Sequence, residues 1–398
     1  MTNVAQHLKR TKNETFFRLH KKMRFQFASI VLLALVVNLA SGQRAARCDP
    51  NTCRLPNCFC GGTQVPGGYS KEDIPQFVLL TFDDAVNSLN QQFFKDLFTD
   101  ERRNPNGCPI KSTLYISHEW TDYSQVQDLY ADGHEVASHT VTHSDGKGFD
   151  EGKWADELIG MAEMLVRYAG VKPQDIKGMR APFLQVGGDK MFNTLRRYGL
   201  YYDSSMSTSS PSWPYTLEYQ MPHSCAVNPC PEMSHPGMWE IPMPTLKDVR
   251  GGSCAMADGC YYEEDADSIQ KIFTQNFLDN YTGDKTPFPL FFHSAWFFNR
   301  PHRSEGFFRF IDSILALPDV YFVTSQELIN WMKNPQPINA VATSEVFGCD
   351  FRDRPQRCNR RQKKKCALKF RGDTRQWSSC QVDTCPRTYP WVNNLSGN

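Results

Sequence analysis

Between residues 76 and about 333, short apolar runs alternate with longer amphipathic stretches, and this alternation constrains the fold more than any other feature of the chain. The apolar runs have the length of buried strands, predicted at 77–81, 112–117, 135–138, 177–181, 200–203, 239–243, 290–293 and 320–324. Helices are predicted at 89–98, 123–131, 154–168, 189–198, 267–278 and 306–317. Strands and helices in alternation predict parallel strands joined by right-handed crossovers. We therefore expect an irregular (β/α) barrel of about seven or eight strands.

The N-terminus and the cysteines indicate a secreted protein. A basic stretch precedes an apolar run from Phe27 to Ala40, and small residues at Ala40, Ser41 and Gly42 suit signal cleavage, so residues 1–42 are predicted to be a signal peptide. Translation from Met23 would give a signal of ordinary length. The alternative is an uncleaved anchor, but the run is short for a membrane span. All 14 cysteines follow Gly42, and their even number favours an oxidising compartment.

Composition divides the rest of the chain into three parts. Residues 43–75 form a cysteine-rich collar, for which we expect disulfides, with a zinc site as the rival interpretation. Residues 76–335 hold the barrel, and the loops 204–238 and 244–265 are long enough to shape a binding site. Residues 336–398 form a cysteine-rich extension with ten bases against two acids between positions 350 and 372. This basic run is either a solvated surface or an anion-binding patch.

Charge argues against one class of partner. The chain has 44 Lys and Arg against 43 Asp and Glu, a net charge of +1, so nucleic acid is not expected to be its main partner.

No membrane span is predicted after signal removal, and the protein is expected to be a monomer. The sequences Asn280-Tyr281-Thr282 and Asn394-Leu395-Ser396 match the glycosylation acceptor pattern.

Chemistry-bearing residues follow several of the predicted strands. Asp83 and Asp84 end the first strand, where two adjacent carboxylates need a cation or a function. His139 and His143 follow the third strand, and two histidines at this spacing plus one carboxylate make a catalytic metal site with open positions. Solvated loop residues are the alternative for each motif alone. Because barrel active sites lie at strand carboxyl ends, their common location favours a site.

Further polar residues lie at other strand ends. Arg180 closes the fourth strand and carries a fork suited to a carboxylate, although a surface ion pair is the alternative. Asp203 ends the fifth strand. His293 ends the run Leu290-Phe291-Phe292, where a satisfied core histidine is the competing interpretation.

As an ordered set, these residues resemble the five motifs of the carbohydrate esterase family 4 polysaccharide deacetylases. The motifs are Thr81-Phe82-Asp83-Asp84, His139-Thr140-Val141-Thr142-His143, Arg180-Ala181-Pro182-Phe183, Asp203 with a following Trp, and Leu290-Phe291-Phe292-His293. The surrounding sequence is similar to the arthropod chitin deacetylases, as in Leu184-Gln185-Val186-Gly187-Gly188 and His293-Ser294-Ala295-Trp296-Phe297. The resemblance covers roughly residues 48–333.

The resemblance implies a mechanism, residue by residue. Asp84, His139 and His143 would hold a divalent metal, usually Zn²⁺, for which Co²⁺ is a possible substitute. Asp83 would be the general base that activates water, and Arg180 would pair with it. His293 would be the general acid, and the backbone N–H of Phe183 would stabilise the oxyanion. We assign the acid that tunes His293 to Asp203.

The resemblance also implies the substrate, which is chitin or a chito-oligosaccharide. Four cysteines in the collar are too few for a chitin-binding module, so the chain looks like a catalytic-only, gut-type enzyme, released into the gut lumen or the peritrophic matrix. Aromatic residues at the barrel mouth are then expected to bind the sugar, and Trp213 and Trp239 compete for the pocket wall. The full set of aromatic candidates is Trp120, Trp213, Trp239, Trp296 and Phe297.

Two alternatives remain. A chitin-binding or matrix-structural protein with little activity is the first, although binding alone needs no metal triad. A deacetylase of another acetylated polysaccharide is the second.

Overall fold

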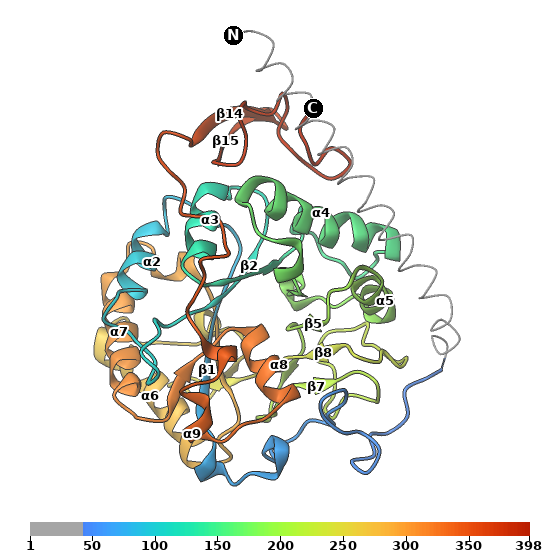
Figure 1. Ribbon diagram of the computed structural model, residues 1–398, viewed down its shortest axis with the longest axis vertical. Coiled ribbons are helices and arrows are strands. Elements are labelled where there is room, and N and C mark those ends of the chain that lie inside the picture. The colour runs from blue at the N-terminus through green and yellow to red at the C-terminus, as the bar shows by residue number, and fades with distance from the viewer. Residues whose placement is uncertain (1–42) are drawn as a thin grey trace.

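The core of the molecule is an open, irregular (β/α) barrel, as the alternating pattern predicts. The structure is a computed structural model that describes residues 43–398; the predicted signal peptide lies outside them. Eight strands of one sheet follow the order β12-β1-β2-β3-β4-β5-β8-β7, and β13 also pairs with β1 (Figure 1). All of these pairings are parallel except that of β7 with β8. The path ends at β12 and β7, so the barrel is open there within the described residues.

The predicted elements are present, with shifted ends. The strands of the main sheet are β1 Gln76–Asp83, β2 Thr113–Ile116, β3 Glu135–Ser138, β4 Gly178–Met179, β5 Tyr202–Asp203, β7 Tyr215–Thr216, β8 Trp239–Glu240, β12 Phe288–His293 and β13 Val320–Phe322. The remaining strands are β6 Ser207–Thr208, β9 Met243–Pro244, β10 Leu246–Lys247, β11 Ser253–Cys254, β14 Lys364–Phe370 and β15 Asp373–Ser379. The helices are α2 Gln91–Leu97, α3 Tyr123–Ala131, α4 Glu151–Ala169, α5 Gly188–Tyr198, α6 Ala266–Thr282, α7 Pro301–Leu315, α8 Ser325–Lys333 and α9 Ile338–Val341.

Strand β1 shows why the pattern predicts the sheet. Every residue of β1 is buried, because helices and neighbouring strands cover both faces of a parallel strand.

Local sequence signals also define the helix ends. Asp122 and Asp150 accept backbone N–H bonds at the starts of α3 and α4, and Gly170 ends α4 with a φ of 67°. None of the helices in the described part of the chain is long and apolar enough to cross a bilayer.

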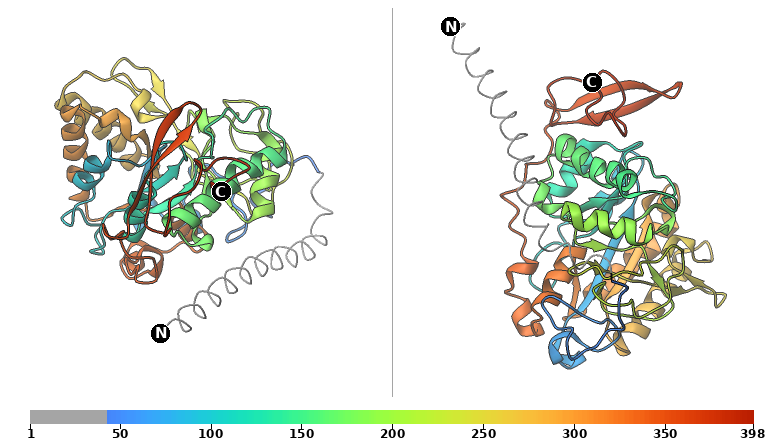
Figure 2. Two further views of the ribbon diagram at one scale, coloured as in Figure 1. Left: turned by 90° about the horizontal axis from the view of Figure 1, so that it is seen from above. Right: turned by 90° about the vertical axis from the view of Figure 1, so that its right-hand side faces the viewer.

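Seven disulfides brace the segments outside the sheet, and within residues 43–398 no cysteine is left free. Cys108 is joined to Cys349, which ties the loop after α2 to the C-terminal extension. The other pairs are Cys48–Cys60, Cys53–Cys58, Cys225–Cys230, Cys254–Cys260, Cys358–Cys380 and Cys366–Cys385. The extension forms the hairpin β14–β15, which packs on α3 at one end of the molecule (Figure 1 and Figure 2).

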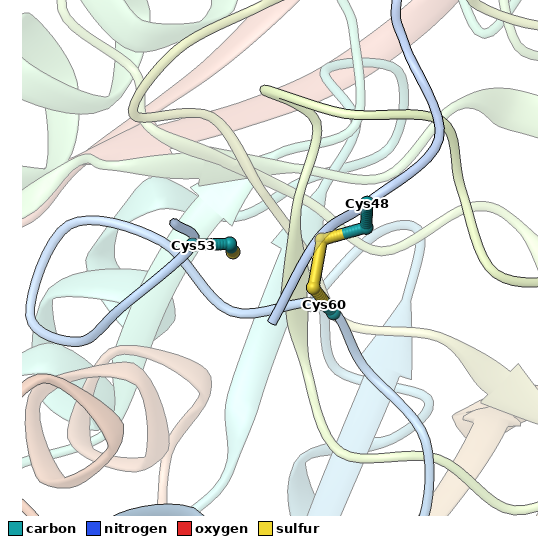
Figure 3. A group of neighbouring side chains, drawn as sticks. All are labelled: Cys48, Cys53 and Cys60. Atoms are coloured by element: carbon teal, nitrogen blue, oxygen red, sulfur yellow. A yellow bond between two sulfur atoms is a disulfide. The ribbon is translucent and has the colours of Figure 1, made fainter. Parts of the chain in front are cut away.

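The collar holds disulfides rather than a metal site. The sulfur atoms of Cys48, Cys53 and Cys60 lie close together, as metal ligands would. Cys48 is, however, bonded to Cys60, as Figure 3 shows. Cys53 is bonded to Cys58. A zinc site needs thiolates, and none remains among these four residues. The zinc interpretation of the collar is therefore wrong.

Candidate active site

Parallel register brings the polar residues of separate motifs to one edge of the sheet. Asp83 is the last residue of β1 and pairs in register with His293, the last residue of β12. His139 follows β3, and Arg180 follows β4, its immediate neighbour in the sheet. The carboxyl ends of these strands therefore form one mouth, where barrel active sites lie.

Asp84, His139 and His143 form a cluster with the geometry of a metal site, called the metal-type cluster below. One ligand atom from each of Asp84, His139 and His143 lies within 4.8 Å of the other two. The Nε2 atom of His143 is 3.1 Å from Asp84 Oδ1, and that of His139 is 3.7 Å away. Nδ1 of His139 donates to the carbonyl of Arg180 at 2.7 Å, which leaves its Nε2 lone pair free to act as a ligand.

The surroundings of this cluster favour an ionised Asp84 carboxylate, and burial favours a neutral His139 imidazole. Burial raises the pKa of Asp84, but the hydrogen bond from His143 and the charge of His139 outweigh it and lower the pKa to about 2. Burial lowers the pKa of His139. Both states are those in which these groups bind a metal.

A buried glutamate shapes the turn that carries the two histidines. Glu157 of α4 is fully buried, and its Oε2 accepts the backbone N–H groups of Val141 and Thr142 at 3.1 and 2.8 Å. Its Oε1 accepts the hydroxyl of Thr142 at 2.7 Å. The motif analysis missed Glu157, and its one sequence signal is an acid within the predicted amphipathic helix.

The backbone at the site is held in an unusual conformation. Asp84, Thr140, His143 and Phe183 all have positive φ values, of 78°, 67°, 51° and 59°. Non-glycine residues rarely adopt this region, and such strain concentrates where a site must aim its side chains. The surrounding hydrogen bonds, including those to Glu157, hold the strained residues in place.

Arg180 and Asp83 form a buried ion pair beside the cluster. Nη1 of Arg180 donates to Asp83 Oδ1 at 2.6 Å, and the two side chains are 0% and 3% exposed. The guanidinium also donates to the carbonyl and hydroxyl of Ser204 and to the hydroxyl of Thr81. Burial lowers the pKa of Arg180, but Asp83 and Tyr115 raise it above its usual value overall. Arg180 therefore keeps its charge.

The acid that contacts His293 is Asp258, and the prediction of Asp203 for this position is wrong. Oδ2 of Asp258 accepts both the backbone N–H and the Nδ1–H of His293, each at 2.7 Å. This hydrogen bond outweighs burial and raises the pKa of His293 to about 9. Nε2 of His293 faces Asp84 at 3.9 Å. Asp258 lies in the predicted loop 244–265, among several other acids, so no local signal distinguishes it.

Asp203 instead forms a buried pair with Glu240. Its strand β5 is five positions from β12 in the sheet, which explains why it does not reach His293. Ser205 donates to Asp203 at 2.6 Å, and the backbone of Met206 donates to Glu240 at 3.0 Å. Burial raises the pKa of Asp203 to about 6 and that of Glu240 well above its ordinary value, so the two carboxyls share a proton near neutral pH.

Phe183 offers both its backbone and its ring to the site. Within the described residues its N–H makes no hydrogen bond, although Leu184 and Gln185 beside it do. Its ring packs edge-on against His143 with centroids 4.8 Å apart, and the residue is 66% exposed. The sequence analysis gave a role only to the backbone N–H of Phe183, so it did not predict that the ring of Phe183 lies exposed beside His143.

Three of the five aromatic candidates are core residues, so the prediction of an exposed ring at the mouth is wrong for Trp213 and Phe297, and Trp239 offers no exposed ring either. Trp213, Trp239 and Phe297 are buried. Trp213 packs on Phe77 near the start of β1, roughly 20 Å along the strand from Asp83. Trp296 is partly buried against Phe292. Trp120 is 51% exposed, and its carbonyl accepts from Asn87, close after the first motif.

The chain is similar to several known proteins. A family model described as polysaccharide deacetylase matches residues 70–202. The chain is 35% identical to chitin deacetylase 1 of Bombyx mori over 89% of this chain and 69% of that protein. It is 34% identical to chitin deacetylase 8 of Bombyx mori over 93% of this chain and 99% of that protein. A chitin deacetylase structure from Colletotrichum lindemuthianum is 15% identical, covers 64% of this chain and 88% of its own, and has a TM-score of 0.37.

Proposed function

The chain belongs to the polysaccharide deacetylase family, and we propose that it is a metal-dependent chitin deacetylase. The reaction hydrolyses the N-acetyl groups of chitin or chito-oligosaccharides and releases acetate and a free amine. The observation that carries this proposal is the convergence of a metal-type cluster, a buried Asp83–Arg180 pair and a His293–Asp258 pair at one mouth. Amide hydrolysis needs a polarised carbonyl, a base and an acid, and these groups correspond to those needs.

Asp84, His139 and His143 would hold the metal ion, which we take to be Zn²⁺ with Co²⁺ as a substitute. The fit rests on two features of this chain: the close spacing of the three ligand atoms, and the fixed tautomer of His139. When bound, the ion polarises the acetyl carbonyl and lowers the pKa of water to about 7.

Asp83 would act as the general base. Its carboxylate is almost fully buried, and Arg180 places a positive charge directly beside it. Because Arg180 occupies Oδ1, the second oxygen of Asp83 is the one available to accept a proton from the attacking water. Arg180 is a positioning residue, since its guanidinium is held by Ser204, Thr81 and Asp83 and has no exposed surface.

His293 would protonate the departing amine. Asp258 accepts the Nδ1–H bond, so Nε2 is the atom that faces the mouth and carries the transferable proton. The raised pKa keeps His293 protonated near neutral pH, as a general acid requires. The free N–H of Phe183 would donate to the carbonyl oxygen as negative charge develops on it.

The exposed aromatics would bind the neutral sugar. The rings of Phe183 and Trp120 remain exposed near the cluster and offer faces for a pyranose to pack against. The seven disulfides fit an oxidising compartment, and we propose that the protein is secreted and acts as a monomer.

Acetate release from an N-acetylglucosamine oligomer tests the proposal. Release should stop on chelation and return when zinc or cobalt is added. Asp83→Asn should lower kcat by about 10²-fold or more while the metal content stays near one per chain. Asp73→Asn, a surface acid in the collar, is the matched control and should keep full activity. A metal-free protein that retains chitin affinity would support a binding or matrix protein instead.

The choice of polymer needs a parallel assay. Acetylated xylan and peptidoglycan are the competing substrates. Chito-oligosaccharides should give the highest kcat/KM, and a preference for either competitor would assign the same chemistry to another polysaccharide.

A further inference from the structure

A basic pocket lies where the C-terminal extension covers the barrel, away from the metal-type cluster. The segment 357–365 of the extension lies along α2 and α3 and encloses a pocket of about 560 Å³ with them. This volume is in the range of pockets that bind small ligands or the residues of a larger one. Its walls include Gln91 and Lys95 of α2, and Ser124, Gln125 and Asp128 of α3.

Positive charge dominates the walls. Five bases line the pocket, and Asp128 is the only acid among its lining residues; the bases are Lys95, Arg357, Arg360, Lys363 and Lys365. Arg357 pairs with Asp132, and Lys363 pairs with Asp122 at 2.7 Å. Lys95, Arg360 and Lys365 form no ion pair with any residue of 43–398 and are solvent-exposed. Three uncompensated charges around one hollow attract an anion.

The pocket is held rigidly enough to be a site. The backbone N–H of Cys358 donates to Asp128 Oδ1 at 2.6 Å, and Gln127 donates to the carbonyl of Gln356 at 2.8 Å. The disulfides Cys358–Cys380 and Cys366–Cys385 tie this segment to the hairpin β14–β15. The backbone that carries the bases of the extension is therefore fixed without a ligand, which reduces the entropy lost when one binds.

We propose that this pocket binds the acidic groups, sulfate or carboxylate, of a polyanionic polysaccharide. Arginine and lysine together suit both oxyanions. The overall charge of +1 argues against a nucleic acid as the ligand, because binding along a phosphate backbone needs a positive excess that extends beyond one pocket. Chitin is neutral and its deacetylated product is cationic, so the pocket recognises a different polymer from the one that reacts at the mouth.

The site would anchor the protein in an acidic matrix. Arg375 of the extension pairs with Glu119 at 2.8 Å, and its guanidinium lies over the ring of Trp120 at the edge of the mouth. The extension thus spans from the basic pocket to the catalytic mouth. A protein retained through the pocket keeps the mouth open for the neutral polymer.

The test measures the affinity of the whole secreted protein for immobilised dextran sulfate, polygalacturonate and uncharged dextran. Both acidic polymers should bind and dextran should not, and the stronger of the two identifies the acidic group. A variant with Lys95→Ala, Arg360→Ala and Lys365→Ala should lose about tenfold or more in affinity at constant salt. Its melting temperature should stay within a few degrees of the parent, because these three side chains form no ion pair.

The matched control removes three exposed bases of the extension that do not line the pocket: Arg361→Ala, Lys369→Ala and Arg387→Ala. It changes the net charge equally and should keep most of the affinity. Equal losses in both variants would show general charge attraction and overturn the proposal. Tighter binding to a DNA duplex than to either acidic glycan, or no binding to either glycan, would also overturn it.

Discussion

The mouth formed by the carboxyl ends of the strands contains two carboxylate–cation pairs that are built in different ways. Asp83 and Arg180 lie at the ends of two strands of the sheet, and their side chains are 3% and 0% exposed. His293 also ends a strand, but its partner Asp258 comes from the short loop closed by Cys254–Cys260, and these side chains are 40% and 10% exposed. The sheet therefore positions the first pair, and a disulfide-closed loop positions the second.

Because the two pairs differ in burial, we expect the first to affect the stability of the fold and the second to affect the protonation of His293. No water can replace either partner of the Arg180–Asp83 pair, so the folded state depends on it. Water can solvate His293 when Asp258 is lost, so that pair affects the protonation of the histidine more than the stability of the fold. The following experiments test this contrast from the largest expected effect to the smallest.

Arg180→Met should have the largest effect. It leaves the Asp83 carboxylate buried without a cation, which should reduce the free energy of unfolding by about 3–5 kcal/mol near neutral pH. Urea unfolding measures the change. Adding Asp83→Leu to Arg180→Met should recover part of the lost stability, because the double variant no longer contains the buried, unpaired carboxylate. Arg309→Met breaks exposed pairs with Glu305 in α7 and with Asp267 in α6 and should change stability by less than about 1 kcal/mol. Similar losses in the two single variants would contradict the role of burial.

Cys254→Ala with Cys260→Ala should have an intermediate effect. Without the disulfide the unfolded chain gains conformational entropy, which reduces the free energy of unfolding by about 2 kcal/mol for a loop of this size. Because Asp258 loses its anchor, kcat for acetate release should also fall. Cys53→Ala with Cys58→Ala opens a collar loop of similar length and should lose comparable stability with kcat unchanged. Equal kcat values in the two variants would show that the Cys254–Cys260 bond does not position Asp258.

Asp258→Asn should have the smallest effect on stability and a clear effect on titration. The hydrogen bond to the Asp258 carboxylate raises the pKa of His293 to about 9 in the folded protein, against about 6.5 in the unfolded chain. The stabilisation is therefore fully present below about pH 6.5 and is lost as the pH rises through about 9. In the chelated protein, nuclear magnetic resonance should find a lower pKa for His293 in the variant. Glu263→Gln, an exposed acid of the same region, should leave the titration unchanged.

The sheet was largely predictable because its signals are local. A run such as that of β1 is apolar throughout because a parallel strand is buried on both faces, and Gly170 and Gly199 stop α4 and α5 where left-handed backbone is needed. Strands β4 and β5 are shorter than predicted, because only two residues of β4 form a ladder with two residues of β5. The hairpin β14–β15 was not predicted, since its cysteines and charges obscure the alternation.

The site was predictable where its residues follow strands. Asp84, His139 and His143 could be grouped because the ends of parallel strands meet at one edge. Trp213 was misplaced, because a tryptophan in a loop-rich segment has no local signal that separates a core ring from an exposed one. Asp203 was misassigned because its place at a strand end resembles that of the functional residues, whereas the sheet order puts it far from His293.

By itself, the sequence determined the strand order along the chain, the residue types at each strand end and the even number of 14 cysteines, which favours an oxidising compartment. Only the tertiary structure decided that Asp258 serves His293, that Glu157 shapes the histidine turn, and that segment 357–365 closes a basic pocket against α2 and α3. The physical reason is range. Strand and helix patterns follow from the nearest residues, whereas these contacts join segments whose separation along the chain is bridged only by packing, disulfides and ion pairs.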